Sequence, residues 1–281
     1  KNSTETIGAV TACGLGLPDR DYYLQDDAKS KETRQRYRAH VQAMLELLGD
    51  EPAQAQAAVD SVLRIETALA EASLTRVERR DPYKTYHRMT PAELQALTPG
   101  FAWKTYFTAV GVPALPSLDV SQPEFMRRIE VLLGKEPVWA WRDYLRWQLV
   151  HGKASYLTKA IVERDFDFFG RYLNGTPELE PRWKRCVSLI DRDLGEALGK
   201  VFVERVFPPS TKQGTVAMTQ EIQAVMADRV KTSPWMSQAT KDQALRKLGT
   251  MRNKVGYPEV WRDYSTLEVR RGDFLGNADR A

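Results

Sequence analysis

Apolar side chains recur every three or four residues along most of this sequence, and that spacing restricts the chain to amphipathic helices. The longest such series contains Trp183, Val187, Ile190, Leu194, Leu198 and Val201. Because an α-helix turns once every 3.6 residues, these side chains stay on one face for about five turns. The series therefore predicts one long helix with a single apolar stripe.

The same spacing predicts helices in several other segments. They span residues 30–48, 137–150, 153–172, 211–231 and 237–252, and another helix starts near Pro52 with Ala58, Val62, Ile65 and Leu69 on one face. The best strand candidates are residues 116–120 and 260–269. We therefore expect a mainly α fold, a multi-helix lobe of long amphipathic helices with few short strands.

Two short segments have the sequence of a helix start. In the first, Thr90 and Glu93 have the spacing of a capping box, and Pro91 stands at the first helical position. Residues 121–124 read SQPE and are a second candidate for the same motif. Each segment predicts a helix that begins at its proline.

The charge balance argues against a nucleic-acid-binding protein. The sequence has 41 Lys and Arg residues against 37 Asp and Glu, a formal net charge of +4, and the two signs are interleaved. Hydrophobic residues make up 42%, which is enough for a substantial core. No apolar run approaches the length of a membrane span, and no signal peptide is visible. We expect a soluble, globular protein.

Several short motifs follow one another in a fixed order. Residues 14–24 read GLGLPDRDYYL, and after them come RRDPY at 79–83, YHRMT at 86–90, PRWKRC at 181–186, GEALGKVFVE at 195–204, PWMS at 234–237 and KVGYP at 254–258. In this order and spacing they resemble the M13 family, the neprilysin-like zinc metallopeptidases. One motif alone would be weak evidence, whereas the ordered series is specific.

The zinc-binding residues of the M13 family are not found in this sequence. Members bind zinc through a helical HExxH motif, whose two histidines reach one metal, and through a later ExxxD motif. His40, His87 and His151 include no pair at i and i+4. Glu163 and Asp167 have ExxxD spacing, but their surroundings differ from the family's, and we interpret them as a solvated helix face. We therefore predict no catalytic, metal-binding or cofactor-binding residue in this chain.

Several charged or reactive residues have a structural interpretation that we favour over a functional one. Residues 19–21 follow a proline and predict a turn whose side chains bond to nearby backbone groups, with two tyrosines packed inward. Residues 79–81 predict a buried or half-buried ion network that holds a loop. Cys13 and Cys186 are too few for a disulfide framework, and we expect two free thiols.

Aromatic residues and histidines also favour packing over binding. Trp139, Trp141 and Trp147 could form a platform for a ligand, but their helical spacing is more typical of core and edge packing. We interpret His87 and His151 as surface or hydrogen-bonded histidines.

The resemblance implies a role for the whole segment. M13 peptidases have two largely helical lobes around a chamber; one lobe holds zinc and the other restricts entry to small peptides. Residues 1–281 match the restricting lobe, and residues from about 253 lead toward the catalytic domain. We expect a fragment of a longer exported precursor that is inactive alone. Its parent would bind zinc, cleave peptides outside the cytoplasm and contact this lobe through its catalytic domain.

Two other functions remain open. The chain could be a non-catalytic protein that binds peptides without cutting them, or a helical scaffold for protein partners. A lobe that normally faces another leaves apolar surface uncovered, so we also expect self-association or a partner chain in solution.

Overall fold

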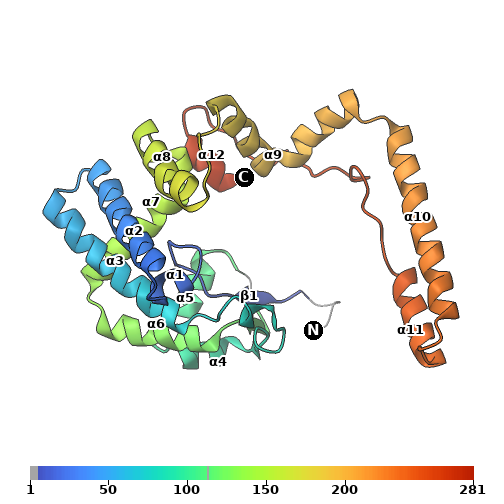
Figure 1. The fold of residues 1–281 in the computed structure, drawn as a ribbon, viewed down its shortest axis with the longest axis horizontal. Helices are drawn as coiled ribbons and strands as arrows, with labels where there is room; N and C mark the ends of the chain where they lie inside the picture. Colours follow the sequence, from blue (N-terminus) through green and yellow to red (C-terminus); the bar gives the residue numbers. More distant parts are fainter. Residues whose placement is uncertain (1–5, 113) are drawn as a thin grey trace. The chain divides into compact units, whose positions relative to one another are not determined.

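The computed structural model describes residues 6–112 and 114–281, which form two compact units. Unit 1 ends at Leu179 and unit 2 comprises Glu180–Ala281. Both units are built mainly from helices, with one small sheet in unit 1, so the predicted mainly α fold is confirmed (Figure 1). Each unit is described below by itself.

Unit 1 consists of helices of very different length. Its α-helices are α1 (Asp21–Leu24), α2 (Ala28–Leu47), α3 (Pro52–Ala72), α4 (Pro91–Leu97), α5 (Trp103–Ala109), α6 (Pro123–Lys135), α7 (Val138–Lys153) and α8 (Lys159–Asp165). Its 3-10 helices are η1 (Glu78–Arg80) and η2 (Ala154–Tyr156), and η3 (Phe166–Leu173) is a π-helix. The long helices α2 and α3 run side by side, and α3 also packs against α6 and α7 (Figure 1).

Local capping decides where several of these helices begin. The Asp27 side chain accepts hydrogen bonds from the first backbone N–H groups of α2, and Thr90 and Glu93 form the predicted capping box of α4. The second predicted capping box is wrong. Helix α6 begins after Gln122, whose side-chain oxygen accepts instead from the backbone N–H of Leu74 at 2.7 Å. The hydroxyl of Ser121, which the capping box would use, has no hydrogen bond among the described residues.

The core of unit 1 has two parts that share α3. The first part lies between α2, α3 and α7, and the second lies between α3, α6 and the sheet. The apolar side chains that the spacing predicted on one face of α2 are buried in the first part. The predicted stripe of α3 is confirmed, since Ala58, Val62, Ile65 and Leu69 are all buried. At about 25 cal/mol per Å² of apolar surface, these stripes supply the main driving force for the packing of α3.

Three short strands close one end of the second core. Strand β3 (Leu118–Val120) pairs in parallel with β1 (Gly8–Val10) and antiparallel with β2 (Arg88–Met89). The strand predicted within 116–120 is thus confirmed. The strand predicted at 260–269 is wrong, because the Asp263 side chain accepts from the backbone N–H of Ser265 and closes a turn there.

The helix predicted over 153–172 is interrupted. Leu157 and Thr158 have extended backbone, with ψ values of −163° and 159°, so η2 ends there and α8 starts afresh. The chain then widens into the π-helix η3. Tyr156 and Phe168 therefore belong to different helices, and only Phe168 is buried in the core.

Unit 2 contains α9 (Arg182–Val206), α10 (Pro209–Thr232), α11 (Gln238–Gly249) and α12 (Phe274–Arg280). Helices α10 and α11 pack together as a hairpin (Figure 1). The helix predicted from Trp183 to Val201 is present, but it is kinked at Leu194, where φ is −129° and ψ is 32°. The kink precedes Gly195 and divides the predicted straight stripe into two segments.

Candidate functional site

Unit 1 contains a fully buried carboxylate, Glu66, in the middle of α3. Its Oε2 accepts from the hydroxyl of Tyr23 at 2.8 Å and of Tyr37 at 2.9 Å. Its Oε1 accepts from the side-chain amide of Gln148 at 2.9 Å and from the backbone N–H of Gly16 at 3.2 Å. Burial raises the pKa of Glu66 to about 7, although the tyrosine hydrogen bonds lower it in part.

Glu66 joins the motif at residues 14–24 to three helices. Tyr37 lies on α2 and Gln148 on α7, while the Tyr23 hydroxyl also accepts from the backbone N–H of Leu17 at 2.8 Å. The indole of Trp147 donates to the Tyr37 hydroxyl at 2.9 Å. Because these hydrogen-bond donors come from different parts of unit 1, the buried carboxylate fixes the positions of the motif, α2 and α7 relative to α3.

The two glycines of the motif are explained by the same centre. A Cβ atom on Gly16 would collide with the hydroxyl of Tyr37, and one on Gly14 would collide with that of Tyr144. Gly14 also has a φ of +92°, which favours glycine. Close approach of the backbone to tyrosine hydroxyls therefore requires glycine at both positions.

The charged residues 19–21 of the motif form a turn, as predicted. The Asp19 side chain accepts from the backbone N–H of Asp21 at 2.8 Å and pairs with Arg76. Arg20 donates to the backbone oxygen of Ser73 at 2.6 Å. These contacts attach the turn to the end of α3, and Tyr23 packs inward beside it.

The ion network predicted at residues 79–81 is wrong. Arg79 and Arg80 are exposed. The neighbouring loop is held instead by Glu78, whose carboxylate accepts from the backbone N–H and the hydroxyl of Thr75 and pairs with Lys84 at 3.1 Å. Both arginines stand at the end of the 3-10 helix η1, which contains no buried residue.

The histidines lie in different environments. His87 is half-buried, and its Nδ1 lies 3.1 Å from the backbone oxygen of Val120. His40 is fully buried against Phe168, with no hydrogen bond to either ring nitrogen among the described residues. His151 lies 3.9 Å from Asp165. Burial lowers the pKa of His40 to about 3 and raises that of Asp165 to about 6.

The donor sets do not fit a zinc ion. Within residues 6–112 and 114–281, no three His, Cys, Asp or Glu side chains come together as metal ligands would. Glu163 and Asp167 pair with basic neighbours one turn away, Lys159 and Arg171, on a solvated surface. Cys13 and Cys186 are both free and exposed.

The three tryptophans of α7 do not form a common surface. Trp147 is buried, Trp141 is half-buried against the second core, and Trp139 is 51% exposed. The interpretation as core and edge packing is confirmed for the first two.

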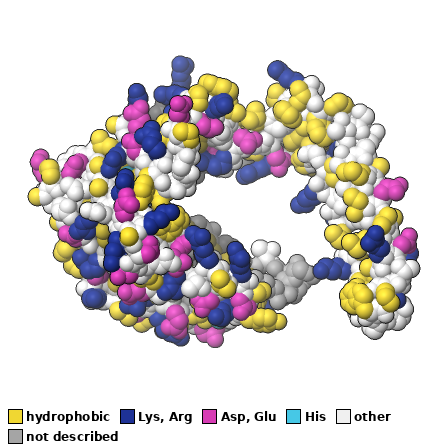
Figure 2. Space-filling view, in the orientation of Figure 1, with side chains coloured by type: hydrophobic (Ala, Val, Ile, Leu, Met, Phe, Trp, Pro, Cys, Tyr) yellow, Lys and Arg dark blue, Asp and Glu magenta, His cyan; other side chains and the backbone are white. Residues whose placement is uncertain are grey.

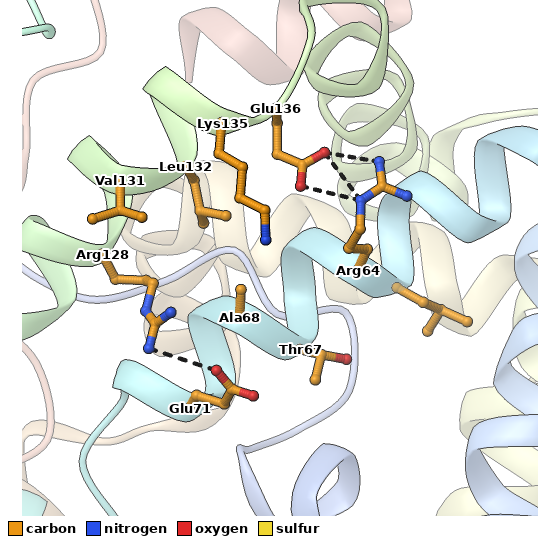
Figure 3. Close-up of a pocket in the computed structure, with 10 residues that line it drawn as sticks. Arg64, Thr67, Ala68, Glu71, Arg128, Val131, Leu132, Lys135 and Glu136 are labelled. Atoms are coloured by element: carbon orange, nitrogen blue, oxygen red, sulfur yellow. Dashed lines mark hydrogen bonds and ion pairs between the residues drawn. The ribbon is translucent and has the colours of Figure 1, made fainter.

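A groove of about 450 Å³ lies between α3 and α6 (Figure 3). Arg64 of α3 forms hydrogen bonds of 2.8–3.1 Å with Glu136, whose side chain is only 4% exposed, and these bonds hold the pKa of the Glu136 carboxyl below its usual value. Arg128 of α6 lies 3.5 Å from Glu71 of α3. Figure 3 shows the ammonium group of Lys135 extending into the space between these two ion pairs.

The helices of unit 2 expose much of their apolar surface. None of the residues in α9, α10, α11 or α12 is buried, and the exposed side chains include Trp183, Phe202, Ile222, Val225 and Met226. Figure 2 shows hydrophobic side chains along the surface of the α10–α11 hairpin. No helix in the described part of the chain has the length and apolar character needed to cross a membrane.

The sequence analysis missed both Glu66 and the groove. Glu66 lies four residues after Val62 on the buried face of α3, so an acid within an apolar stripe was the available signal. Nothing in the sequence around Lys135 indicates that two helices meet there.

The fold and the motifs define a part of a peptidase. A model of Peptidase family M13 matches residues 1–258. The chain belongs to this family, and the resemblance drawn from its motifs is confirmed.

The curated relatives are considerably longer than this chain. Endothelin-converting enzyme 1 of Rattus norvegicus is 30% identical over an alignment 285 residues long, which covers 99% of this chain and 37% of that protein. The same enzyme of Homo sapiens is 29% identical, with the same shares covered. The chain therefore spans a little over a third of these relatives.

Solved structures share the fold. The Mycobacterium tuberculosis zinc metalloprotease Zmp1 in complex with an inhibitor is 36% identical, with a TM-score of 0.87 over 97% of this chain and 41% of that chain. PepO from Lactobacillus rhamnosis is 22% identical, with a TM-score of 0.82 over 97% of this chain and 43% of that chain. At this identity, the likeness to PepO shows only that the two proteins share a fold.

Proposed function

We propose that this chain is the substrate-restricting lobe of a zinc metalloendopeptidase that hydrolyses small peptides. The observation that carries the proposal is the likeness to Zmp1, a zinc metalloprotease, which extends over nearly all of this chain but less than half of that enzyme. The sequence has no HExxH motif, so the zinc and its catalytic glutamate are assigned to a part of the parent protein outside these residues.

The helices of unit 1 are held together firmly enough to form one wall of a substrate chamber. Its helices are joined through a fully buried carboxylate and through ion pairs that link α3 with α6, so they hold a fixed surface. A rigid wall excludes folded proteins by size and limits the access of water to a bound peptide. These tasks require shape and surface charge, and they require no titrating catalytic group in this chain.

Unit 2 supplies the contact with the rest of the parent protein in this proposal. Large apolar side chains are exposed on α9, α10 and α12, and the curated relatives have nearly two thirds of their length outside the matched part. Burial of these side chains against a catalytic domain would remove the exposed surface from water. Residues from about 253 onward would lead toward that domain.

The parent protein is proposed to act outside the cytoplasm, as the resemblance implies.

Structures of Zmp1 have been described in an open and in a partially open state, with TM-scores of 0.84 and 0.78 to this chain. By analogy, the lobe would move relative to the catalytic domain to admit peptides.

The experiment compares these 281 residues with the longer protein that contains them. Zinc content after dialysis and cleavage of a quenched fluorescent peptide are measured for both. We expect zinc and cleavage only in the longer protein. Stoichiometric zinc or cleavage by the 281-residue chain alone would refute the proposal, whereas a reading frame that stops after Ala281 would favour a peptide-binding protein without catalysis.

A further inference from the structure

The groove between α3 and α6 has fixed walls. Each end is closed by an ion pair that joins the two helices, Arg64 with Glu136 and Arg128 with Glu71. The first pair is held by three hydrogen bonds to a nearly buried carboxylate, so the Arg64 guanidinium keeps one orientation at the edge of the groove. Such a cleft is formed before any ligand arrives.

The lining of the groove carries an excess of positive charge. It contains three cations, Arg64, Arg128 and Lys135, against the two carboxylates of Glu71 and Glu136. Both carboxylates face an arginine. Lys135 is in no ion pair among the described residues, and its charge acts on Glu136 only from a distance, where it helps Arg64 to lower the pKa of that carboxyl. The ammonium of Lys135 extends between the two pairs (Figure 3). The unmatched charge and its central position indicate a ligand with a single negative group.

Apart from Thr67, the remaining lining is apolar. Leu63, Ala68 and Leu132 contribute to its surface, and Val131, which is 56% exposed, stands at its edge. A volume of about 450 Å³ is several times that of one carboxylate or phosphate group and falls in the range of sites for larger ligands. An inorganic anion would leave these apolar side chains in contact with water.

We propose that this groove binds a peptide through one carboxylate. The carboxylate, from an acidic side chain or a free C-terminus, pairs with Lys135, while an adjacent apolar side chain of the peptide lies on Val131 and Ala68. The site selects acidic peptides by charge and holds them by apolar contact. It goes beyond the proposed function, because it requires neither zinc nor hydrolysis.

The test measures binding to the 281-residue chain by fluorescence anisotropy. The probe is a labelled hexapeptide with an amidated C-terminus and a central glutamate followed by leucine. A second probe has glutamine in place of the glutamate, and a third has the glutamine and a free C-terminus. We expect the first to bind about tenfold more tightly than the second, as the loss of one charge-assisted hydrogen bond implies. Tight binding of the third probe would show that the groove recognises the free C-terminal carboxylate of a peptide.

Variants locate the site. Lys135→Glu reverses the net charge of the groove and should weaken the binding of the first probe at least tenfold. Lys135→Arg keeps the positive charge and should retain this binding. The matched control is Lys247→Glu on α11 of unit 2, an exposed lysine with the same change of charge, which should leave the affinity unchanged. Thermal unfolding of each variant verifies that it is folded.

Three results would overturn the inference. One is equal affinity for the acidic and the neutral amidated probes. Another is equal weakening by Lys135→Glu and Lys247→Glu, which would indicate general charge attraction. The last is displacement of the peptide by inorganic phosphate at the same concentration as a competing acidic peptide, which would indicate a simple anion site. None of these results bears on zinc binding or cleavage, so the proposed function is judged separately.

Discussion

The hydroxyl of Tyr23 donates a hydrogen bond of 2.8 Å to the carboxylate of Glu66, 43 residues further along the chain. Tyr23 lies in the sequence motif at residues 14–24, and Glu66 lies on the buried face of α3. This contact explains how a loop-forming motif becomes a fixed part of the helical core. The stability of unit 1 should therefore depend strongly on the carboxylate.

Glu66→Ala should destabilise unit 1 by about 3 kcal/mol or more, because each buried donor left without an acceptor costs about 1–3 kcal/mol. The hydroxyls of Tyr23 and Tyr37 lose their acceptor, and the amide of Gln148 keeps only the backbone oxygen of Gly14, at 3.2 Å. Urea unfolding followed by circular dichroism measures the change. Glu71→Ala is the control on the same helix: its side chain is 49% exposed, and the free energy of unfolding should change by about 0.5 kcal/mol or less.

The stability of the wild type should carry a pH-dependent contribution from Glu66. Its pKa is about 7 in the fold against 4.5 in the unfolded chain, so the folded state binds more protons between these values. The contribution is complete below pH 4.5, is lost as the pH rises to 7 and is constant above. We measure the free energy of unfolding of wild type and of Glu66→Gln across this pH range. The value for wild type minus the value for Glu66→Gln should fall by up to about 3 kcal/mol as the pH rises. A constant difference would contradict the pKa assignment.

His40 should show the opposite dependence. Its pKa is about 3 in the fold against 6.5 when unfolded, so its contribution is complete above pH 6.5 and is lost as the pH falls toward 3. His40→Met should remove this loss. The variant should also be more stable at neutral pH by about 1 kcal/mol, because neither buried ring nitrogen has a hydrogen bond among the described residues. Lower stability at pH 7.5 would show that the ring has a partner such as water.

Gly16→Ala should destabilise unit 1 by about 2 kcal/mol, a typical cost of overpacking, because the new methyl group collides with the Tyr37 hydroxyl. Gly152→Ala is the matched control. Gly152 lies inside α7 with nothing within 4 Å of the added methyl group, so alanine should stabilise by about 0.5 kcal/mol. Thermal unfolding of both variants measures the two effects, and equal destabilisation would contradict the argument.

The apolar surface of α10 should drive self-association of the isolated chain. Ile222 and Met226 are 58% and 50% exposed, one turn apart on the same helix. The double variant Ile222→Gln with Met226→Gln should shift sedimentation toward a smaller species at the same concentration. Ala224→Gln on another side of α10 should leave sedimentation unchanged. A wild type that is monomeric at high concentration would contradict the expectation.

Residue spacing predicted the helices well and their interruptions poorly. The stripes of α2 and α3 follow from local periodicity, because the spacing places the apolar side chains of a helix on one face. The kink at Leu194 and the break at Leu157 are not visible in the apolar spacing, which continues through both positions. The capping box at Thr90 formed because its partners are three residues apart, whereas Ser121 and Glu124 have the same spacing and α6 instead begins after Gln122, which bonds to Leu74 across 48 residues.

The sequence by itself determined the helical class and, through its ordered motifs, the peptidase family. It did so because helix periodicity and short motifs are encoded by neighbours along the chain. Only the tertiary structure decided that Glu66 is a buried acceptor and that Lys135 stands between two ion pairs. Burial and electrostatic fields arise from residues that are distant in sequence, so no local pattern can specify them.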